Sequence, residues 1–300
     1  MRSVRRVTAT MVRTPTGALA LAGVALLVGL AIFAPLLWGD QADRLDVTAA
    51  GQGPSAEHWL GTDELGRDIL LRTLVATRLA LLLDLAAVGS AAVIGIALGV
   101  AIGFGARWLR SAATTAIDTC LSFGDVLLAI VVLAVVGVGT RGTVIAVALS
   151  FVATFARMAM TMTRGVLVQE YVAAARVVGV PRRRLATRYL LPNVAEGLTV
   201  FLCTSLGSGL LAISALSFLG LGVQPPQYDW GQMLTEGTRQ FYTNPAAALA
   251  PAAMIGFAGL TLSLLGDALA RAANPLVWTA SRSARRGRRA RRAHALETAA

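Results

Sequence analysis

Six apolar runs, each about as long as a membrane-spanning helix, dominate this chain of 300 residues. A helix needs about 20 mostly apolar residues to cross the hydrocarbon core of a bilayer. The runs cover residues 17–37, 79–105, 117–139, 143–163, 197–222 and 246–270. Hydrophobic residues make up 56% of the chain and charged residues only 14%, which is too few charges for a water-soluble surface. We therefore predict an all-α integral membrane protein with six transmembrane helices.

The arginines predict how these helices are oriented. The chain has no lysine, so arginines supply all 27 of its positive side chains. If the N-terminus is cytoplasmic, 21 arginines lie on that side and 6 on the other. Cytoplasmic loops of membrane proteins are enriched in Arg and Lys. We therefore expect both termini to be cytoplasmic, and the net charge of +11 requires no nucleic acid to explain it.

This orientation divides the chain into five parts. We expect a cytoplasmic tail at 1–16, a first transmembrane helix at 17–37, an extracytoplasmic loop at 38–78, a five-helix transmembrane domain at 79–270 and a basic cytoplasmic tail at 271–300. The first run follows four arginines, as the apolar core of a signal peptide does, but it is too long, so we predict that it is retained. The last tail contains RRGRRARR, whose attraction to anionic lipid is about 1 kcal/mol per residue near the surface.

One polar segment lies between two apolar runs and reads QEYVAAARVVGVPRRRLATRYLLPN, from Gln169 to Asn193. Gly179 and Pro181 predict a turn between two short helices, and Pro192 is expected to end the second. Hydrated arginines beside apolar side chains suit a surface that engages a soluble partner. The alternative, that the arginines only fix orientation, stays open. The apolar residues that we expect to contact such a partner are Val172, Ala175, Val178, Leu185 and Tyr189.

Several kinds of chemistry are excluded by composition. Without lysine the chain can form neither a phosphate-binding loop of the Walker type nor a Schiff base. The two histidines, His58 and His294, are too far apart in sequence for a local zinc motif. Cys120 and Cys203 fall inside predicted spans, where we expect packing rather than a disulfide. We therefore predict a non-catalytic chain without a cofactor, driven by a partner or an ion gradient.

Four aspartates fall inside the predicted spans, where a charge is costly. Asp84, Asp118 and Asp267 lie near predicted helix ends, so we expect them to be solvated at the membrane interface. Asp125 lies deeper, in SFGDVLLAI, and is a candidate for a water-filled pathway. A single acid does not make a proton relay, so a purely structural role for Asp125 stays open.

A resemblance to a known family rests on three blocks of sequence. The first is EYVAAARVVGVPRRRLATRYLLPN, which resembles the cytoplasmic EAA loop of ATP-binding-cassette importer permeases. The other two are HWLGTDELGRDILLRTL at 58–74 and LSFLGLGVQPPQYDWGQML at 216–234. They are similar to two outer-side signatures of the C-type permease of dipeptide, oligopeptide and nickel importers. The likeness covers about residues 17–275, and three motifs in this order are highly specific.

The resemblance implies a type I importer fold. In such an importer, a B-type and a C-type permease together form the pathway, and each EAA loop docks on one of two cytoplasmic ATPases. An extracytoplasmic binding protein delivers the substrate, while ATP and Mg²⁺ bind to the ATPases. This chain would then be one permease of a bacterial inner-membrane peptide importer, with its coupling loop at 164–193.

The resemblance also assigns roles to particular residues. The coupling residues are Glu170, Tyr171, Ala174, Ala175, Arg176, Gly179 and Pro181. The residues of the outer block, which caps the pathway after the fifth span, are Ser217, Phe218, Gly220, Gly222, Pro225, Pro226, Trp230 and Gly231. Within this block, Gly220 and Gly222 suit close helix packing and a sharp exit from the membrane.

The chain departs from the family pattern at three positions. Ala173 replaces the glutamate of the EAA motif, which removes a charge from the ATPase interface, and Glu170 matches a different family position. Gly124 and Asp84 stand where the family tends to carry proline and glycine within spans. Both exchanges affect the local kink and the packing of the spans.

Two other classes of protein share some of these features. A gradient-driven secondary transporter would share the hydropathy, but it usually carries several intramembrane charges and inverted repeats, which we do not find here. A membrane-embedded enzyme would need a nucleophile paired with a base, and no local pairing stands out. Within the importer reading, the cargo stays open between peptides, nickel chelates and other small solutes.

Overall fold

The computed structural model describes residues 14–181 and 184–273, so most of both predicted tails, including RRGRRARR and His294, lies outside the described residues. In the described part, the regular elements are helices, and an isolated bridge joins Thr62 to Asp68. The elements are α2 (Pro15–Ala42), η1 (Val47–Ala49), α3 (Ile69–Phe104), α4 (Arg107–Ser122), α5 (Asp125–Val136), α6 (Thr140–Leu167), α7 (Glu170–Val177), η2 (Leu185–Leu190), α9 (Leu191–Phe218), α10 (Trp230–Arg239) and α11 (Ala246–Ala273).

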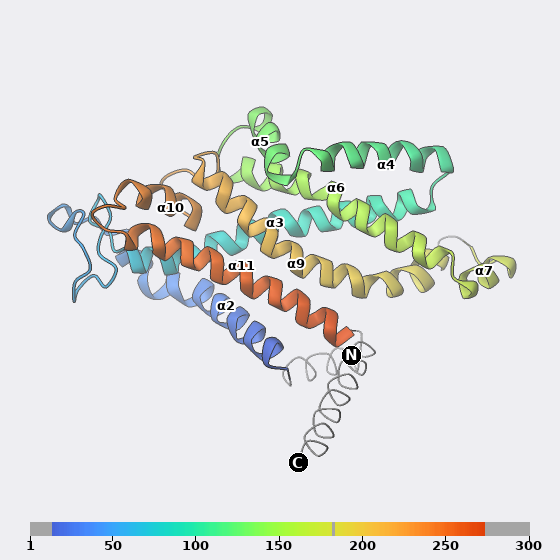
Figure 1. Ribbon diagram of the computed structural model, residues 1–300, viewed down its shortest axis with the longest axis horizontal. Coiled ribbons are helices and arrows are strands. Elements are labelled where there is room, and N and C mark those ends of the chain that lie inside the picture. Colours follow the sequence, from blue (N-terminus) through green and yellow to red (C-terminus); the bar gives the residue numbers. More distant parts are fainter. Residues whose placement is uncertain (1–13, 182–183, 274–300) are drawn as a thin grey trace, which may run out of the picture.

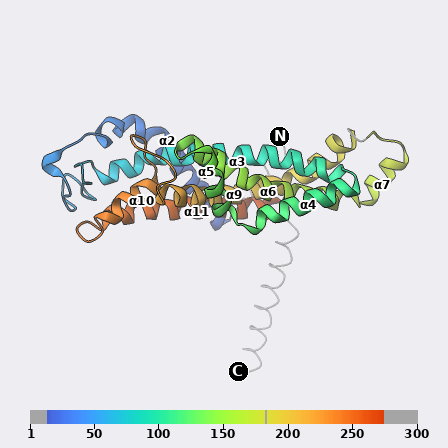
Figure 2. The ribbon, with the colours of Figure 1, turned by 90° about the horizontal axis from the view of Figure 1, so that it is seen from above.

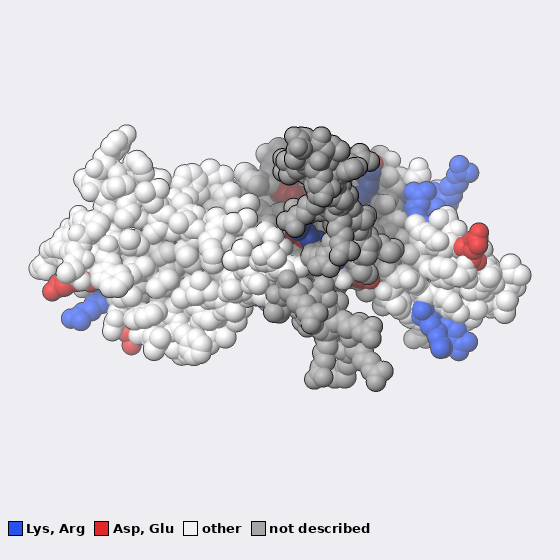
Figure 3. Space-filling view, turned by 60° about the horizontal axis from the view of Figure 1, so that its bottom comes forward, with Lys and Arg blue, Asp and Glu red and all other residues white. Residues whose placement is uncertain are grey.

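The long helices run side by side along one axis, with α7 beyond one end and α10 with the loop before α3 at the other (Figures 1 and 2). Helix α3 is central because small residues let α6 approach it closely. A Cβ atom added at Gly95 would lie 2.7 Å from the Val152 carbonyl oxygen, and one at Gly99 would lie 2.4 Å from that of Ala156. Such contacts between small residues hold membrane helices together. Figure 3 shows a broad uncharged surface between the charged residues at the left-hand end and the middle of the molecule.

Five helical segments of the described chain are long and apolar enough to cross a membrane: Pro15–Ala42, Ile69–Phe104, Thr140–Leu167, Leu185–Phe218 and Ala246–Ala272. The predicted all-α membrane fold is confirmed by these segments. The third predicted span, 117–139, is wrong as a single straight helix, because α4 and α5 meet at a bend of 93°. Gly124 has φ +74° and ends the helical path at this bend. Helix α5 alone, with 12 residues, is about 18 Å long and too short to span.

Among the helices that extend past their predicted bounds, α2 and α3 show the cause. Helix α2 starts at Pro15, where the Thr14 hydroxyl accepts a hydrogen bond from the Gly17 amide over 3.2 Å, and ends only at Ala42. Helix α3 starts at Ile69, where the Asp68 carboxylate accepts from the Leu71 amide over 2.9 Å. Residues 69–78 are therefore helical rather than part of the predicted loop at 38–78. The cause is an N-cap that stands ahead of the apolar run.

The early start of α3 changes the position of Asp84. This residue lies near the middle of α3 and is only 2% exposed, so the expected interfacial solvation is wrong. Its Oδ1 atom would be 2.5 Å from a Cβ atom added at Gly209 of α9, and it has no hydrogen-bond partner among the described residues. Position 84, where the resemblance implies a glycine, holds a carboxyl group instead, and the absence of a side chain at Gly209 leaves room for it. Asp267, by contrast, is exposed near the end of α11, as expected.

The second helix of the polar segment does not end at Pro192. The π-helix η2 leads directly into α9, so Leu185–Phe218 forms one 34-residue segment with Pro192 in the first turn of α9. A proline inside an α-helix lacks an N–H donor and collides with the carbonyl group four residues before it. The wider π turn immediately before Pro192 relieves this conflict, because it changes which amide faces each carbonyl group.

Candidate functional site

Helix α7 and the turn after it form the middle of the coupling loop predicted at 164–193, beyond one end of the bundle (Figure 1), and the ends of that range belong to α6, η2 and α9. We call α7 and this turn the coupling loop from here on. The Val180 amide donates to the Ala175 carbonyl and the Gly179 amide to the Arg176 carbonyl, both over 3.0 Å. These two hydrogen bonds define a Schellman motif, which ends a helix with a residue in the left-handed conformation. Gly179 occupies this position with φ +82°. The predicted turn at Gly179 is confirmed.

The underside of this loop holds it to the bundle. Val172, Ala175 and Leu185 are buried together, and Phe104 of α3 and Leu167 of α6 pack against them. The expectation that these three residues contact a soluble partner is therefore wrong, because the apolar face that suggested it is covered by the protein's own helices. Tyr189 also packs against this cluster.

The opposite side of the loop is open to solvent. Tyr171 is 45% exposed, Val177 is 88% exposed and Val178 is 83% exposed. Of the predicted coupling residues, Ala175 alone is buried, and the exposed ones are Glu170, Tyr171, Ala174, Arg176, Gly179 and Pro181. We did not single out Val177 from the sequence, although its spacing of three from Ala174 places both on one face of a helix.

The predicted outer block forms a joint between α9 and α10 at the other end of the bundle. The Ser217 hydroxyl donates to Asp229 Oδ2 over 2.7 Å and accepts from the Val223 amide over 3.2 Å. A Cβ atom added at Gly222 would lie 2.1 Å from Ser217 Oγ, so only glycine fits there. Asp229 caps α10 through the Gln232 amide, over 2.9 Å. Burial raises the pKa of the Asp229 carboxyl above its usual range, while these hydrogen bonds oppose the shift.

The other predicted residues of the outer block differ in exposure. Trp230 is fully buried, and its indole N–H donates to the Thr73 carbonyl of α3 over 2.9 Å. A Cβ atom added at Gly231 would lie 2.4 Å from the Ser214 carbonyl oxygen, so α10 approaches α9 closely at this point. Phe218 is partly exposed, and Gly220, Pro225 and Pro226 are exposed. Ser217 and Phe218 are the last residues of α9 rather than part of a loop.

A buried ion-pair network ties this joint to the loop before α3, and no residue of it was singled out from the sequence. Arg72 of α3 is 2% exposed, and its Nη1 lies 2.7 Å from Asp63 Oδ2 and 3.0 Å from Glu236 Oε2 of α10. The Arg67 Nε is 2.7 Å from the same Asp63 oxygen. Tyr228 stacks on the Arg72 guanidinium at 4.3 Å. The block at 58–74 contained the signal, since it places acids and arginines at short spacing.

Helix α4 presents a polar face. Ser111, Thr115, Thr119 and Ser122 are exposed on it, and Asp118 on the same helix forms an ion pair with Arg157 of α6. The two charged side chains are 48% and 43% exposed. Asp118 is thus paired rather than solvated at an interface, and Arg157 lies ten residues before the end of α6, so it is not a loop arginine. An open ion pair at this depth disfavours contact with lipid tails.

Asp125, the predicted pathway candidate, is half-buried at the first position of α5, directly after the bend at Gly124. The exposed side of α5 is otherwise apolar, with Val126, Leu127 and Val131 open. Asp125 therefore lies where the polar face of α4 meets the apolar face of α5. Its assignment to a pathway stays a prediction.

Comparison with known proteins gives the family. Residues 95–279 match the family of binding-protein-dependent transport system inner membrane components. The chain is 34% identical to the dipeptide transport system permease protein DppC of Alkalihalophilus pseudofirmus, over 82% of this chain and 81% of that protein. It is 35% identical to the glutathione transport system permease protein GsiD of Pectobacterium atrosepticum over 84% of each chain, and 36% identical to that of Escherichia coli O1:K1 over 85% and 84%. The chain therefore belongs to the family of binding-protein-dependent transport system inner membrane components, the permease family expected from its sequence.

Proposed function

We propose that this chain forms one half of a pathway for small peptides across the bacterial cytoplasmic membrane and docks an ATPase through α7. A homologous B-type permease supplies the other half, two ATPases bind ATP and Mg²⁺, and an extracytoplasmic protein delivers the peptide. The peptide class is supported by the names of the relatives, which transport dipeptides and glutathione. Both are short chains with free carboxylate and ammonium groups.

The docking proposal rests on the observation that one side of α7 is buried and the other is exposed. Its underside is buried in the bundle, while Tyr171, Ala174 and Val177 form an open stripe at spacing i, i+3 and i+6. A short helix that presents apolar anchors suits a groove on a soluble partner. Because Ala173 replaces the family glutamate on this exposed side, contact through apolar and backbone groups outweighs charge in the proposed interface.

The polar face of α4 supports the pathway proposal. A membrane protein places paired charges toward a water-filled cavity or another protein rather than toward lipid. Asp118 and Arg157 together offer one group of each sign, which suits a zwitterionic peptide. We therefore assign the faces of α4 and α5 that carry Asp118 and Asp125 to the boundary with the partner permease.

One helical segment also connects the two ends of the bundle mechanically. The segment Leu185–Phe218 starts beside the buried underside of α7 and ends at the Ser217–Asp229 joint. With both termini cytoplasmic, as the arginine asymmetry indicates, this segment would carry a displacement of α7 to the outer cap. The arginine asymmetry remains strong when Arg157, which lies within the spanning part of α6, is no longer counted as a cytoplasmic arginine.

Site-specific photo-cross-linking tests the docking. The assembled importer is purified with a photoreactive amino acid in place of Val177, and a matched complex carries it at Gln227, which is exposed at the opposite end. We expect an adduct with the ATPase from position 177 and none from position 227. An intact complex with no ATPase adduct from position 177, or from 174, contradicts the docking. Uptake of labelled dipeptide into proteoliposomes, competed by tripeptides and by a nickel chelate, tests the substrate class.

A further inference from the structure

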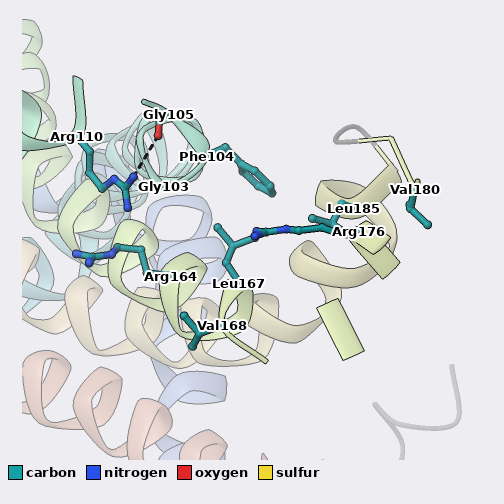
Figure 4. Close-up of a pocket in the computed structure, with 10 residues that line it drawn as sticks. All are labelled: Gly103, Phe104, Gly105, Arg110, Arg164, Leu167, Val168, Arg176, Val180 and Leu185. Carbon is teal, nitrogen blue, oxygen red and sulfur yellow. Dashed lines mark hydrogen bonds between the residues drawn. The ribbon is translucent and has the colours of Figure 1, made fainter. Parts of the chain in front are cut away.

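A basic pocket lies between the coupling loop and the bundle, in a cavity of about 460 Å³. Three arginines from three helices line it: Arg110 of α4, Arg164 of α6 and Arg176 of α7 (Figure 4). The rest of its wall is mainly apolar and includes Phe104, Leu167 and Leu185. The volume is in the range of about 300–1,000 Å³ that is typical of small-molecule sites.

The positive charge of this pocket is uncompensated. Among the described residues, no acidic side chain lines it and none of the three guanidinium groups forms an ion pair. The Arg110 Nη2 reaches only the Gly105 carbonyl, at 3.4 Å, while its Nε is buried without a hydrogen-bond partner among the described residues. A buried donor that lacks an acceptor is costly. Arg164 and Arg176 are exposed, so water screens part of the repulsion among the three cations. An anion in the pocket would supply the missing acceptor and reduce the repulsion that remains.

The position of the pocket in the fold identifies the kind of anion. It opens where the spanning helices α3 and α6 end, at Phe104 and Leu167. Trp108, two residues before Arg110, is 74% exposed, and exposed tryptophans are enriched at the level of lipid headgroups. Basic pockets between helices at this level bind anionic headgroups. A free phosphate ion would leave the apolar part of the wall unused, whereas a phospholipid would contact it.

We propose that this pocket binds the headgroup of an anionic phospholipid, which is held by the positive charges of Arg110, Arg164 and Arg176. The bound lipid connects α4 and α6 to α7, so it holds the underside of the coupling loop against the bundle. The order of the loop, and with it transport, then depends on the anionic lipid content of that leaflet. Lipid binding itself requires neither the peptide nor the ATPase assignment, so its test stands apart from the proposed function.

The test titrates the assembled, delipidated importer in detergent with dioleoylphosphatidylglycerol and counts bound lipids by native mass spectrometry. Dioleoylphosphatidylcholine is the control for charge, and inorganic phosphate and glycerol 3-phosphate are the free-anion controls. We expect the anionic lipid to bind at least tenfold more tightly than phosphatidylcholine, and neither small anion to compete at matched concentration. Equal binding of the two lipids overturns the proposal, and efficient competition by inorganic phosphate overturns the assignment to a lipid.

Variants locate the site. The double variant Arg110→Gln, Arg164→Gln should weaken lipid binding about thirtyfold, which corresponds to about 2 kcal/mol, or about 1 kcal/mol per cation, at 1.4 kcal/mol per factor of ten. The double variant Arg110→Lys, Arg164→Lys keeps the charge and should stay within about threefold. Arg141→Gln, Arg239→Gln removes two exposed arginines near the opposite end and should have no effect. If the glutamine pair does not assemble, each single glutamine variant should show about a fivefold loss.

Two results would refute the site. The first is unchanged lipid binding in the glutamine variants. The second is loss of the ATPase from the complex with lipid binding intact, which would mean that the pocket receives an acidic side chain of that partner instead.

Discussion

The turn at Gly179 offers a sharp test of the coupling loop, because the space around it is open. A Cβ atom added there meets nothing within 4 Å, so a substitution disturbs only the backbone conformation. The position has φ +82° and donates its amide to the Arg176 carbonyl. A series of Gly179→Asn, Gly179→Ala and Gly179→Val therefore varies the cost of the left-handed conformation without a steric clash at Cβ.

The size of the effect follows from this geometry. The left-handed conformation costs an ordinary L-residue about 1–2 kcal/mol, less for asparagine and up to about 3 kcal/mol for a β-branched residue. A tenfold loss of the native turn corresponds to about 1.4 kcal/mol. We expect asparagine to be nearly neutral, alanine to lower the population of the turn severalfold and valine to lower it by about a hundredfold relative to the competing conformations.

The assay is peptide uptake in cells, together with membrane abundance of the permease and its co-purification with the partner permease. The buried contacts of Val172 and Leu185 and the long helices are untouched, so abundance and pairing should stay near normal in all three variants. Uptake should fall in the order Asn, Ala, Val. Normal uptake by Gly179→Val would refute the reasoning, and so would a fall in uptake that only follows a fall in abundance.

Three further predictions address the rest of the molecule. In a background without Cys120 and Cys203, Ser55→Cys and Gln227→Cys should react with an impermeant thiol reagent outside intact cells, while Arg184→Cys should not. The reverse labelling pattern would show that the orientation is inverted. Thr62 is unsuitable for this test because it is fully buried. Arg72→Ala should destabilise the outer cap by about 1–3 kcal/mol, because Asp63 and Glu236 lose their buried partner and keep only Arg67, whereas Arg239→Ala should have little effect in the same thermal unfolding measurement. Asp118→Arg and Arg157→Asp should each abolish uptake and together restore part of it, and full activity of both single variants would show that the pair is dispensable.

Much of the fold could be predicted because lipid imposes a simple requirement. An apolar run of sufficient length must become a helix in a bilayer, since no other local structure satisfies its backbone. Helices α3, α6, α9 and α11 follow directly from that requirement, and a membrane permease without catalytic function follows from the family and agrees with the lack of lysine. The bend at Gly124 could not be predicted in the same way. Hydropathy averages over the run at 117–139 and does not detect one residue with φ +74°.

Features of the candidate site could be predicted where they depend on neighbouring residues in the sequence. They were missed where they depend on contacts between distant elements. Gly179 ends a helix, and its turn belongs to a short sequence pattern. The cap that Asp229 forms on α10 is equally local but was not predicted. Arg72 reaches Glu236 across 164 positions of sequence, and Arg157 reaches Asp118 on a different helix. Such pairs exist only once the helices have packed. The burial of Val172 and Leu185 was missed for the same reason, since an apolar face does not say which neighbour covers it.

The continuity of η2 and α9 has a mechanical consequence. If Pro192 ended a helix, a flexible joint would separate the coupling loop from the fifth span, and a displacement of α7 would be lost in bending. Instead, the π turn of Leu185–Leu190 accommodates Pro192, and the helical segment runs for 34 residues, about 50 Å. Leu185, at its first turn, is buried against α7, and Ser217, at its last turn, holds Asp229 at the start of α10. Movement at one end must therefore tilt or shift the other, because both ends are fixed by buried contacts and the helix between them has no break.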